Sequence, residues 1–224
     1  MMPKYKVVVF DLDDTLYKEI DFLKSAYREI SDSLCKEYCV EGLFEKMLHD
    51  YEIGKNAFQE VIDSYQLPIK LEALLEMYRN HFPDISLDGD TRYVLNSLKS
   101  NGFGLGIITD GRQTTQTNKM MALGLNYYIN DNHIVISEVC GHEKTDGFGF
   151  AQIENCFPDC DYYYVGDNPQ KDFIAANERG WTTICLLDDG RNIHKQNFDF
   201  PESYQPKYKI ANIKELGSSE FCNV

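Results

Sequence analysis

Residues 5–16 read YKVVVFDLDDTL, and this stretch decides the fold. Its first half is dominated by β-branched and aromatic residues, which is typical of a buried strand. The apolar run then ends abruptly at Asp11, Asp13 and Thr15, so the strand passes directly into a polar loop. The sequence therefore predicts a buried strand whose carboxyl end carries acidic side chains.

The sequence after this loop changes to a helical pattern. From Phe22 to Phe82, apolar residues recur every three or four positions, as they do on one face of a helix. Short segments containing Gly or Pro divide the pattern into four amphipathic helices, within residues 22–38, 43–51, 58–65 and 71–82. Four consecutive helices with short connections favour a small helical bundle.

From Leu87 onward, predicted strands alternate with predicted helices. The strands cover residues 103–109, 134–136, 162–165, 182–187 and 208–210, and the helices cover residues 94–98, 120–123 and 150–156, with a further helix opening at Asn168-Pro169. This alternation predicts an α/β fold with a parallel sheet covered on both faces. We expect residues 1–16 and 87–224 to form this core. Residues 17–86 would form a helical cap over the carboxyl ends of the strands, where α/β sheets bind their ligands.

The net charge of the chain limits which classes of partner it can bind. Asp and Glu number 36 against 22 Lys and Arg, which gives a net charge of −14 over 224 residues. This balance argues against a nucleic-acid partner, because binding to a phosphate backbone needs clustered Lys and Arg. A small phosphorylated molecule remains compatible, since surface charges are screened beyond about 8 Å at physiological salt and the groups lining a pocket decide its binding.

The cysteines and the apolar segments indicate in which cellular compartment the protein is expected. The seven cysteines, at positions 35, 39, 140, 156, 160, 185 and 222, have no common zinc-ligand spacing. We expect free thiols in a reducing compartment. No signal-peptide pattern precedes the first strand, and no apolar run is long enough to cross a bilayer. The expectation is a cytoplasmic protein with no membrane partner.

Four groups of polar residues follow predicted strands in the sequence. They are Asp11, Asp13 and Thr15; Thr109, Asp110 and Gly111; Glu143 and Lys144; and Gly166, Asp167 and Asp172. Alone, the Asp11 and Asp13 pair is as typical of a solvated loop or a helix cap as of a functional site, and the other groups are more typical of turns, helix starts or an exposed surface. Because the strands of a parallel sheet point the same way, however, groups far apart in the sequence meet at one edge. The four groups together predict a functional site.

The order and spacing of these groups resemble the four motifs of the haloacid dehalogenase superfamily. In order, the matching segments are residues 10–16 (FDLDDTL), residues 107–111 (IITDG), Lys144 with Asp146, and residues 165–172 (VGDNPQKD). Thr145 stands where the family usually has proline after the lysine. The resemblance implies a Rossmann-like core, and the helical insertion resembles the C1-type cap of the family.

The resemblance also implies a reaction and a metal. Asp11 would attack phosphorus and form an aspartyl-phosphate, while Asp13 would protonate the leaving oxygen and later activate water. A carboxylate that attacks an anionic phosphate needs a cation to offset the repulsion, and Mg²⁺ supplies that charge in an oxygen-rich shell. In the family pattern the Mg²⁺ ligands would be Asp11, the backbone carbonyl of Asp13, and Asp167.

The remaining motif residues take supporting roles in the same pattern. The Thr109 hydroxyl and the backbone N–H groups around Asp110 and Gly111 would bind the phosphate oxygens. Lys144 would offset the charge of those oxygens and keep Asp11 ionised. Asp172 would support the metal ligands or reach the ion through water, and Thr15 would lie in the same outer layer.

The function that this pattern implies is a Mg²⁺-dependent phosphatase acting on a small phosphorylated metabolite. Asp13 argues against dehalogenation, because a dehalogenase has no leaving alkoxide to protonate. A phosphomutase similar to beta-phosphoglucomutase is one alternative, since it uses the same core and differs in how well water is excluded. A non-catalytic module that binds a phosphometabolite or a protein is another. The sequence leaves open the substrate, whether sugar phosphate or nucleotide, and the oligomeric state.

Overall fold

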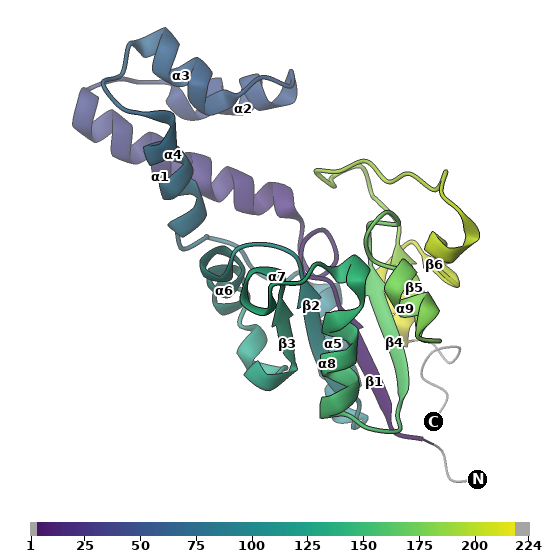
Figure 1. Ribbon diagram of the computed structural model, residues 1–224. Coiled ribbons are helices and arrows are strands. Elements are labelled where there is room, and N and C mark those ends of the chain that lie inside the picture. Colours follow the sequence, from purple (N-terminus) through teal and green to yellow (C-terminus); the bar gives the residue numbers. More distant parts are fainter. Residues whose placement is uncertain (1–3, 218–224) are drawn as a thin grey trace.

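The computed structural model describes residues 4–217 and has an α/β fold built on one parallel sheet (Figure 1). The strand order is β3-β2-β1-β4-β5-β6, and every neighbouring pair of strands is parallel. The strands are β1 Lys6–Phe10, β2 Gly104–Thr109, β3 Ile134–Ile136, β4 Asp161–Gly166, β5 Thr182–Leu186 and β6 Tyr208–Ile210. The predicted fold class is confirmed.

Alternate side chains of β1 enter two separate hydrophobic layers. Val8 and Phe10 pack in one layer with residues of α5 (Gly89–Ser100) and α6 (Gln113–Ala122). Val7 and Val9 pack in the other layer with residues of α8 (Phe148–Cys156) and α9 (Ile174–Glu178). Successive side chains of a strand point to opposite faces, so a central strand covered on both sides is apolar throughout. This explains the unbroken apolar run at the start of the sequence.

The first four of the five helices between β1 and β2 form a third hydrophobic cluster. They are α1 Glu19–Tyr38, α2 Leu43–Glu52, α3 Ala57–Tyr65 and α4 Leu71–Asn80. Their buried residues include Leu34, Met47, Val61 and Leu74, which share one core separate from the sheet layers. Figure 1 shows these helices above the sheet, on the side where β1 ends. The boundaries 17–86 for a cap domain stay a prediction.

The short elements complete the described chain. They are α7 Ser137–Cys140 and the 3-10 helices Leu125–Tyr127, Asp131–His133, Lys144–Asp146, Glu202–Tyr204 and Ile213–Gly217. No helix within residues 4–217 is both long and apolar enough to cross a membrane. The described cysteines are free, as expected, whereas Cys222 lies outside the described residues.

One predicted helix start is wrong. The sequence predicts a helix from Asn168-Pro169, but α9 begins at Ile174. The carboxylate of Asp172 accepts hydrogen bonds from the N–H groups of Asp167 (3.1 Å) and Asn168 (2.8 Å). These bonds hold the segment as a turn around the carboxylate, because a side-chain acceptor competes with the helical pattern of backbone bonds.

Candidate active site

The sheet brings the ends of three central strands to one edge. Phe10 of β1 lies beside Ile107 of β2 and Val165 of β4 in the strand register. Asp11 follows Phe10 directly, and its N–H donates to the carbonyl of Val165 at 2.8 Å. The first, second and fourth groups of polar residues therefore leave the sheet side by side, as the parallel topology predicts.

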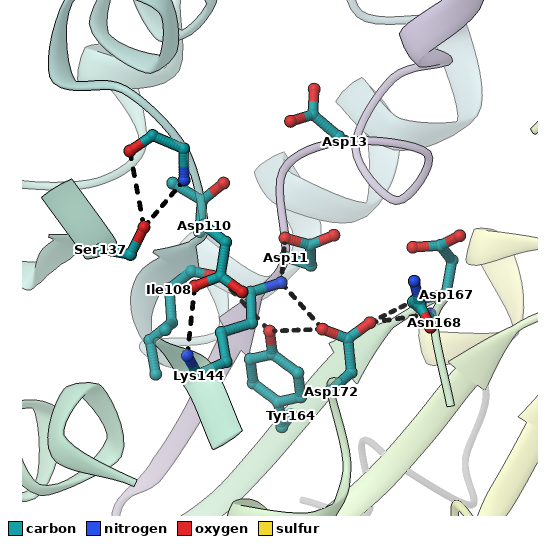
Figure 2. A network of polar contacts seen from close by, with 12 residues as sticks. Asp11, Asp13, Ile108, Asp110, Ser137, Lys144, Tyr164, Asp167, Asn168 and Asp172 are labelled. Carbon is teal, nitrogen blue, oxygen red and sulfur yellow. Dashed lines mark hydrogen bonds and ion pairs between the residues drawn. The ribbon is translucent and has the colours of Figure 1, made fainter. Parts of the chain in front are cut away.

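Lys144 lies between two buried carboxylates at this edge (Figure 2). Its Nζ is 2.5 Å from Oδ1 of Asp11 and 2.8 Å from Oδ1 of Asp172. Burial alone would lower the pKa of Lys144, but the negative charges of Asp11 and Asp172 raise that pKa well above its ordinary value. Lys144 is thus a fixed positive charge next to the predicted nucleophile.

Asp172 is fully buried and joins Lys144 to the loop that follows β4. Its Oδ1 accepts from Lys144 and from the hydroxyl of Tyr164 at 3.3 Å, while its Oδ2 accepts the N–H groups of Asp167 and Asn168. Four donors leave little capacity for direct metal binding. The position fits the predicted supporting role of Asp172.

One side-chain oxygen each of Asp11, Asp167 and Asp172 lies within 4.8 Å of the other two. Three carboxylates face one lysine, so the group carries two uncompensated negative charges when all are ionised. Burial and the neighbouring carboxylates Asp172 and Asp11 raise the pKa of Asp167 to about 9. Burial raises the pKa of Asp11 to about 8, despite the lowering effect of Lys144. A divalent cation would balance this charge, and an all-oxygen donor set fits Mg²⁺.

Asp13 lies near the acidic group, but its carboxylate points away from Asp11 toward α6 (Figure 2). Oδ1 accepts from Lys119 Nζ at 2.7 Å and from the Tyr17 hydroxyl at 2.5 Å. Oδ2 accepts from Gln116 Nε2 at 2.9 Å. Burial alone would raise the pKa of Asp13, but the charge of Lys119 and the hydrogen bonds from Lys119, Tyr17 and Gln116 lower this pKa below its usual range. In this arrangement Asp13 is held as an anion.

The second group of polar residues supports these contacts. The buried Thr109 hydroxyl accepts from Gln116 at 2.7 Å, so Gln116 links Thr109 to Asp13. Asp110 does not point into the acidic group; its Oδ1 accepts the backbone N–H of Lys144 at 3.1 Å. Its role in this structure is to orient the turn that carries Lys144.

For two further predicted residues, Gly111 and Thr15, the contacts do not reveal the predicted role. The N–H of Gly111 donates to Ser137 Oγ at 2.9 Å and is engaged there (Figure 2). The Thr15 hydroxyl is buried and has no hydrogen-bond partner among residues 4–217. The phosphate-binding role of the Gly111 N–H and the outer role of Thr15 stay predictions.

Sequence reasoning missed Gln116 and Lys119, which bind the Asp13 carboxylate. Both are buried, although they are polar residues on a helix. They are three positions apart and therefore share one helix face. That helix directly follows the Thr109-Asp110-Gly111 segment, so polar residues in its first turns were candidates for the same edge. The missed signal was a polar pair at helical spacing.

A parallel α/β sheet with this carboxylate–lysine group at its edge, beneath an inserted helical block, defines a capped hydrolase of the haloacid dehalogenase type. Residues 8–186 match the family described as Haloacid dehalogenase-like hydrolase. The match covers most of the chain, and the chain belongs to this family. It is therefore an enzyme, as the sequence implied.

Relatives and solved structures agree with this assignment. The glyceraldehyde 3-phosphate phosphatase of Methanocaldococcus jannaschii is 26% identical over 94% of this chain and 95% of its own length. The HAD hydrolase YfnB of Bacillus subtilis is 19% identical, with a TM-score of 0.68 over 99% of this chain and all of that chain. A Thermotoga maritima protein described as a beta-phosphoglucomutase is 17% identical, with a TM-score of 0.63 over 94% and 96% of the two chains. The two solved structures share the fold with this chain.

The packing at Gly166 gives a first prediction. A Cβ at this position would lie 2.5 Å from Asp172 Oδ2, so Gly166→Ala must displace the carboxylate that holds Lys144. We expect a loss of about 1–3 kcal/mol in the free energy of unfolding, as for other overpacked sites, measured by urea denaturation. Gly89→Ala is the matched control, because a Cβ there meets nothing within 4 Å. Equal stability of the two variants would contradict this account of Gly166.

Proposed function

We propose that this enzyme is a Mg²⁺-dependent phosphatase that hydrolyses a small phosphorylated metabolite, with Asp11 as the nucleophile. One observation carries the proposal: the buried Asp11 carboxylate, bound by Lys144 at 2.5 Å, belongs to a group of three carboxylates with too few positive charges. A structural ion pair would be balanced, whereas this group needs a cation and anionic-substrate chemistry supplies a reason for one.

Asp11 begins the reaction by attacking the phosphorus atom of the substrate. The bond from one Asp11 oxygen to phosphorus forms as the bond from phosphorus to the leaving oxygen breaks, which gives an aspartyl-phosphate. Lys144 offsets the negative charge of the transferring oxygens. Bound Mg²⁺, held by Asp11, Asp167 and the Asp13 carbonyl, would shield the repulsion between carboxylate and phosphate.

Asp13 acts as the general acid in the first half of the reaction and as the general base in the second. The negative charge of an incoming phosphate raises the pKa of Asp13 and favours its protonated form, which donates to the leaving oxygen. The resulting carboxylate then takes a proton from the water that attacks the aspartyl-phosphate and releases inorganic phosphate. Lys119, Gln116 and Tyr17 stabilise that carboxylate and so support the second half.

The substrate proposed first is a three-carbon aldehyde phosphate. The supporting observation is the Methanocaldococcus jannaschii relative, which carries the name glyceraldehyde 3-phosphate phosphatase and aligns over 95% of its length. A small substrate also suits a site whose carboxylates, Asp11, Asp167 and Asp172, are buried.

A substrate panel tests the proposed function. Glyceraldehyde 3-phosphate, hexose phosphates, nucleoside monophosphates and p-nitrophenyl phosphate are incubated with the protein, and inorganic phosphate is measured. We expect phosphate release with Mg²⁺, its loss with EDTA, and its return with excess Mg²⁺, because the uncompensated carboxylates need the cation. Release of no phosphate from any compound would contradict the proposal, and isomerisation of a hexose phosphate without release would favour the phosphomutase.

Replacing the nucleophile tests the role of Asp11. Asp11→Asn should lower kcat on p-nitrophenyl phosphate by more than about 10⁴-fold, as expected for the loss of a covalent nucleophile. The Asn oxygen still accepts from Lys144, so we expect the fold to be kept and circular dichroism to be unchanged. A variant with wild-type turnover would overturn the nucleophile assignment.

Removing the buried positive charge tests the role of Lys144. Lys144→Met keeps most of the volume but leaves the transferring oxygens without their cationic partner, so kcat should fall on the order of 100-fold or more. Lys195→Ala removes an exposed lysine and serves as the control, with wild-type kcat expected. If the two variants had the same kcat, Lys144 would have no part in catalysis.

A further inference from the structure

The segment after β5 connects the acidic group with the start of the inserted helices. Residues 187–196, which we call the strap, contain no helix or strand. Figure 1 shows this segment within the yellow-green loop that rises beside the lower end of α1. Residues 14–21, which lead from β1 into α1, are named the cap entry. The strap contacts both the cap entry and the loop after β4.

On the side of the sheet, the strap binds Asp167 through two side chains. Asn192 Nδ2 donates to Asp167 Oδ2 at 2.9 Å. Gln196 Nε2 donates to the backbone carbonyl of Asp167 at 2.6 Å and to that of Leu186 at 2.7 Å. The carboxylate and the backbone of Asp167 are therefore held from the same short segment.

On the side of the inserted helices, the strap binds the cap entry. Lys18 Nζ donates to Asn192 Oδ1 at 2.7 Å, and the N–H of Ile193 donates to the buried Asp14 Oδ2 at 3.0 Å. The side chain of Ile193 also packs against the hydrophobic cluster of α1–α4. The strap is thus attached to the cap entry by two hydrogen bonds and to α1–α4 by one apolar side chain.

Asn192 is the residue that belongs to both sets of contacts. Its amide nitrogen binds Asp167, and its amide oxygen binds Lys18. The amide is planar, so these two atoms cannot move independently. It is also neutral, so it orients the Asp167 carboxylate without cancelling the negative charge that a cation requires. A lysine in the same place would compete with the cation.

We propose that Asn192 is a positioning residue, which fixes the rotation of the Asp167 carboxylate for the divalent cation and links that rotation to the cap entry through Lys18. This inference rests on the proposed function, because it assumes that a cation binds Asp167. A change in the direction of α1 relative to the sheet moves Lys18, and the rigid amide passes this movement to Asp167. Metal binding and cap position are coupled in this way.

Binding of Mn²⁺ to the full-length protein tests the first part without any measurement of turnover. The signal of free Mn²⁺ in electron paramagnetic resonance gives the Kd for the wild type, Asn192→Leu and the control Asn197→Leu. Asn192→Leu keeps the volume but removes the donor, and its Kd should rise about 10-fold or more, as for other lost partners of metal ligands. Asn197 is exposed, and its Oδ1 accepts the N–H of Asp199, outside the strap and the acidic group, so its variant should bind Mn²⁺ as the wild type does.

A double-mutant cycle tests the coupling to the cap entry. Lys18→Met should raise the Kd for Mn²⁺ by about threefold, near the low end of coupling between contacting residues. In the Asn192→Leu background the same change should have a smaller effect, because the amide that reaches Asp167 is gone and only the contact of Lys18 with Asp189 of the strap, at 3.2 Å, remains. An equal effect of Lys18→Met in both backgrounds, or wild-type affinity in Asn192→Leu, would overturn the inference.

The controls separate this inference from the proposed function. A wild-type protein that binds no Mn²⁺ would contradict the metal site itself, whereas equal binding by wild type and Asn192→Leu would contradict only the role of Asn192. Circular dichroism checks that each variant is folded. Should Asn192→Leu fail to fold, Asn192→Ala removes the same donor in its place and carries the same expected change.

Discussion

The contact of Lys144 with the two buried carboxylates of Asp11 and Asp172 is the interaction on which the rest of the site depends. It joins the end of β1, the turn at residues 144–146 and the loop after β4, which are far apart in the sequence. Desolvating three charges is costly, and removing one partner leaves a buried charge uncompensated. The cost is offset here because Asp172 also accepts from Tyr164 and from two backbone N–H groups. A change at any of these three segments therefore alters the surroundings of Asp11.

The same contact leaves the site with more negative than positive charge when its carboxylates are ionised. Lys144 can balance only one of the three carboxylates, and burial raises the pKa of both Asp167 and Asp11. Folding stability alone would favour a balanced or apolar arrangement. A protein retains such an imbalance where the missing charge arrives with a ligand, and the ligand then binds more tightly because it relieves the repulsion. The unbalanced charge of the acidic group therefore supports the proposal that it binds a cation.

Much of the fold and part of the site could be predicted from the sequence, for reasons of periodicity and topology. Apolar runs and helical spacing are local signals, and parallel strands bring their ends to one edge, which places Asp11, Lys144 and Asp167 together. The helix predicted to begin at Asn168 does not begin there, because the Asp172 carboxylate accepts the backbone N–H groups of Asp167 and Asn168. Asn192 gave no signal at all, since it lies in a segment without periodicity and its partner Lys18 is 174 positions away. Contacts of this kind depend on tertiary packing alone.

The point at which the helices are inserted affects Asp13, the residue proposed for acid–base catalysis. Asp13 directly precedes the cap entry, whose first residue, Asp14, turns the chain with a φ of 55°. The Tyr17 hydroxyl binds Asp13 from within the cap entry, and the Asp14 carboxylate accepts the N–H of Glu19 at the start of α1. Lys119, which also binds Asp13, lies 4.4 Å from the ring centroid of Phe22 in α1. A rotation of the helical block would therefore rearrange the donors around Asp13, and the acid–base role proposed for Asp13 would then depend on the position of that block.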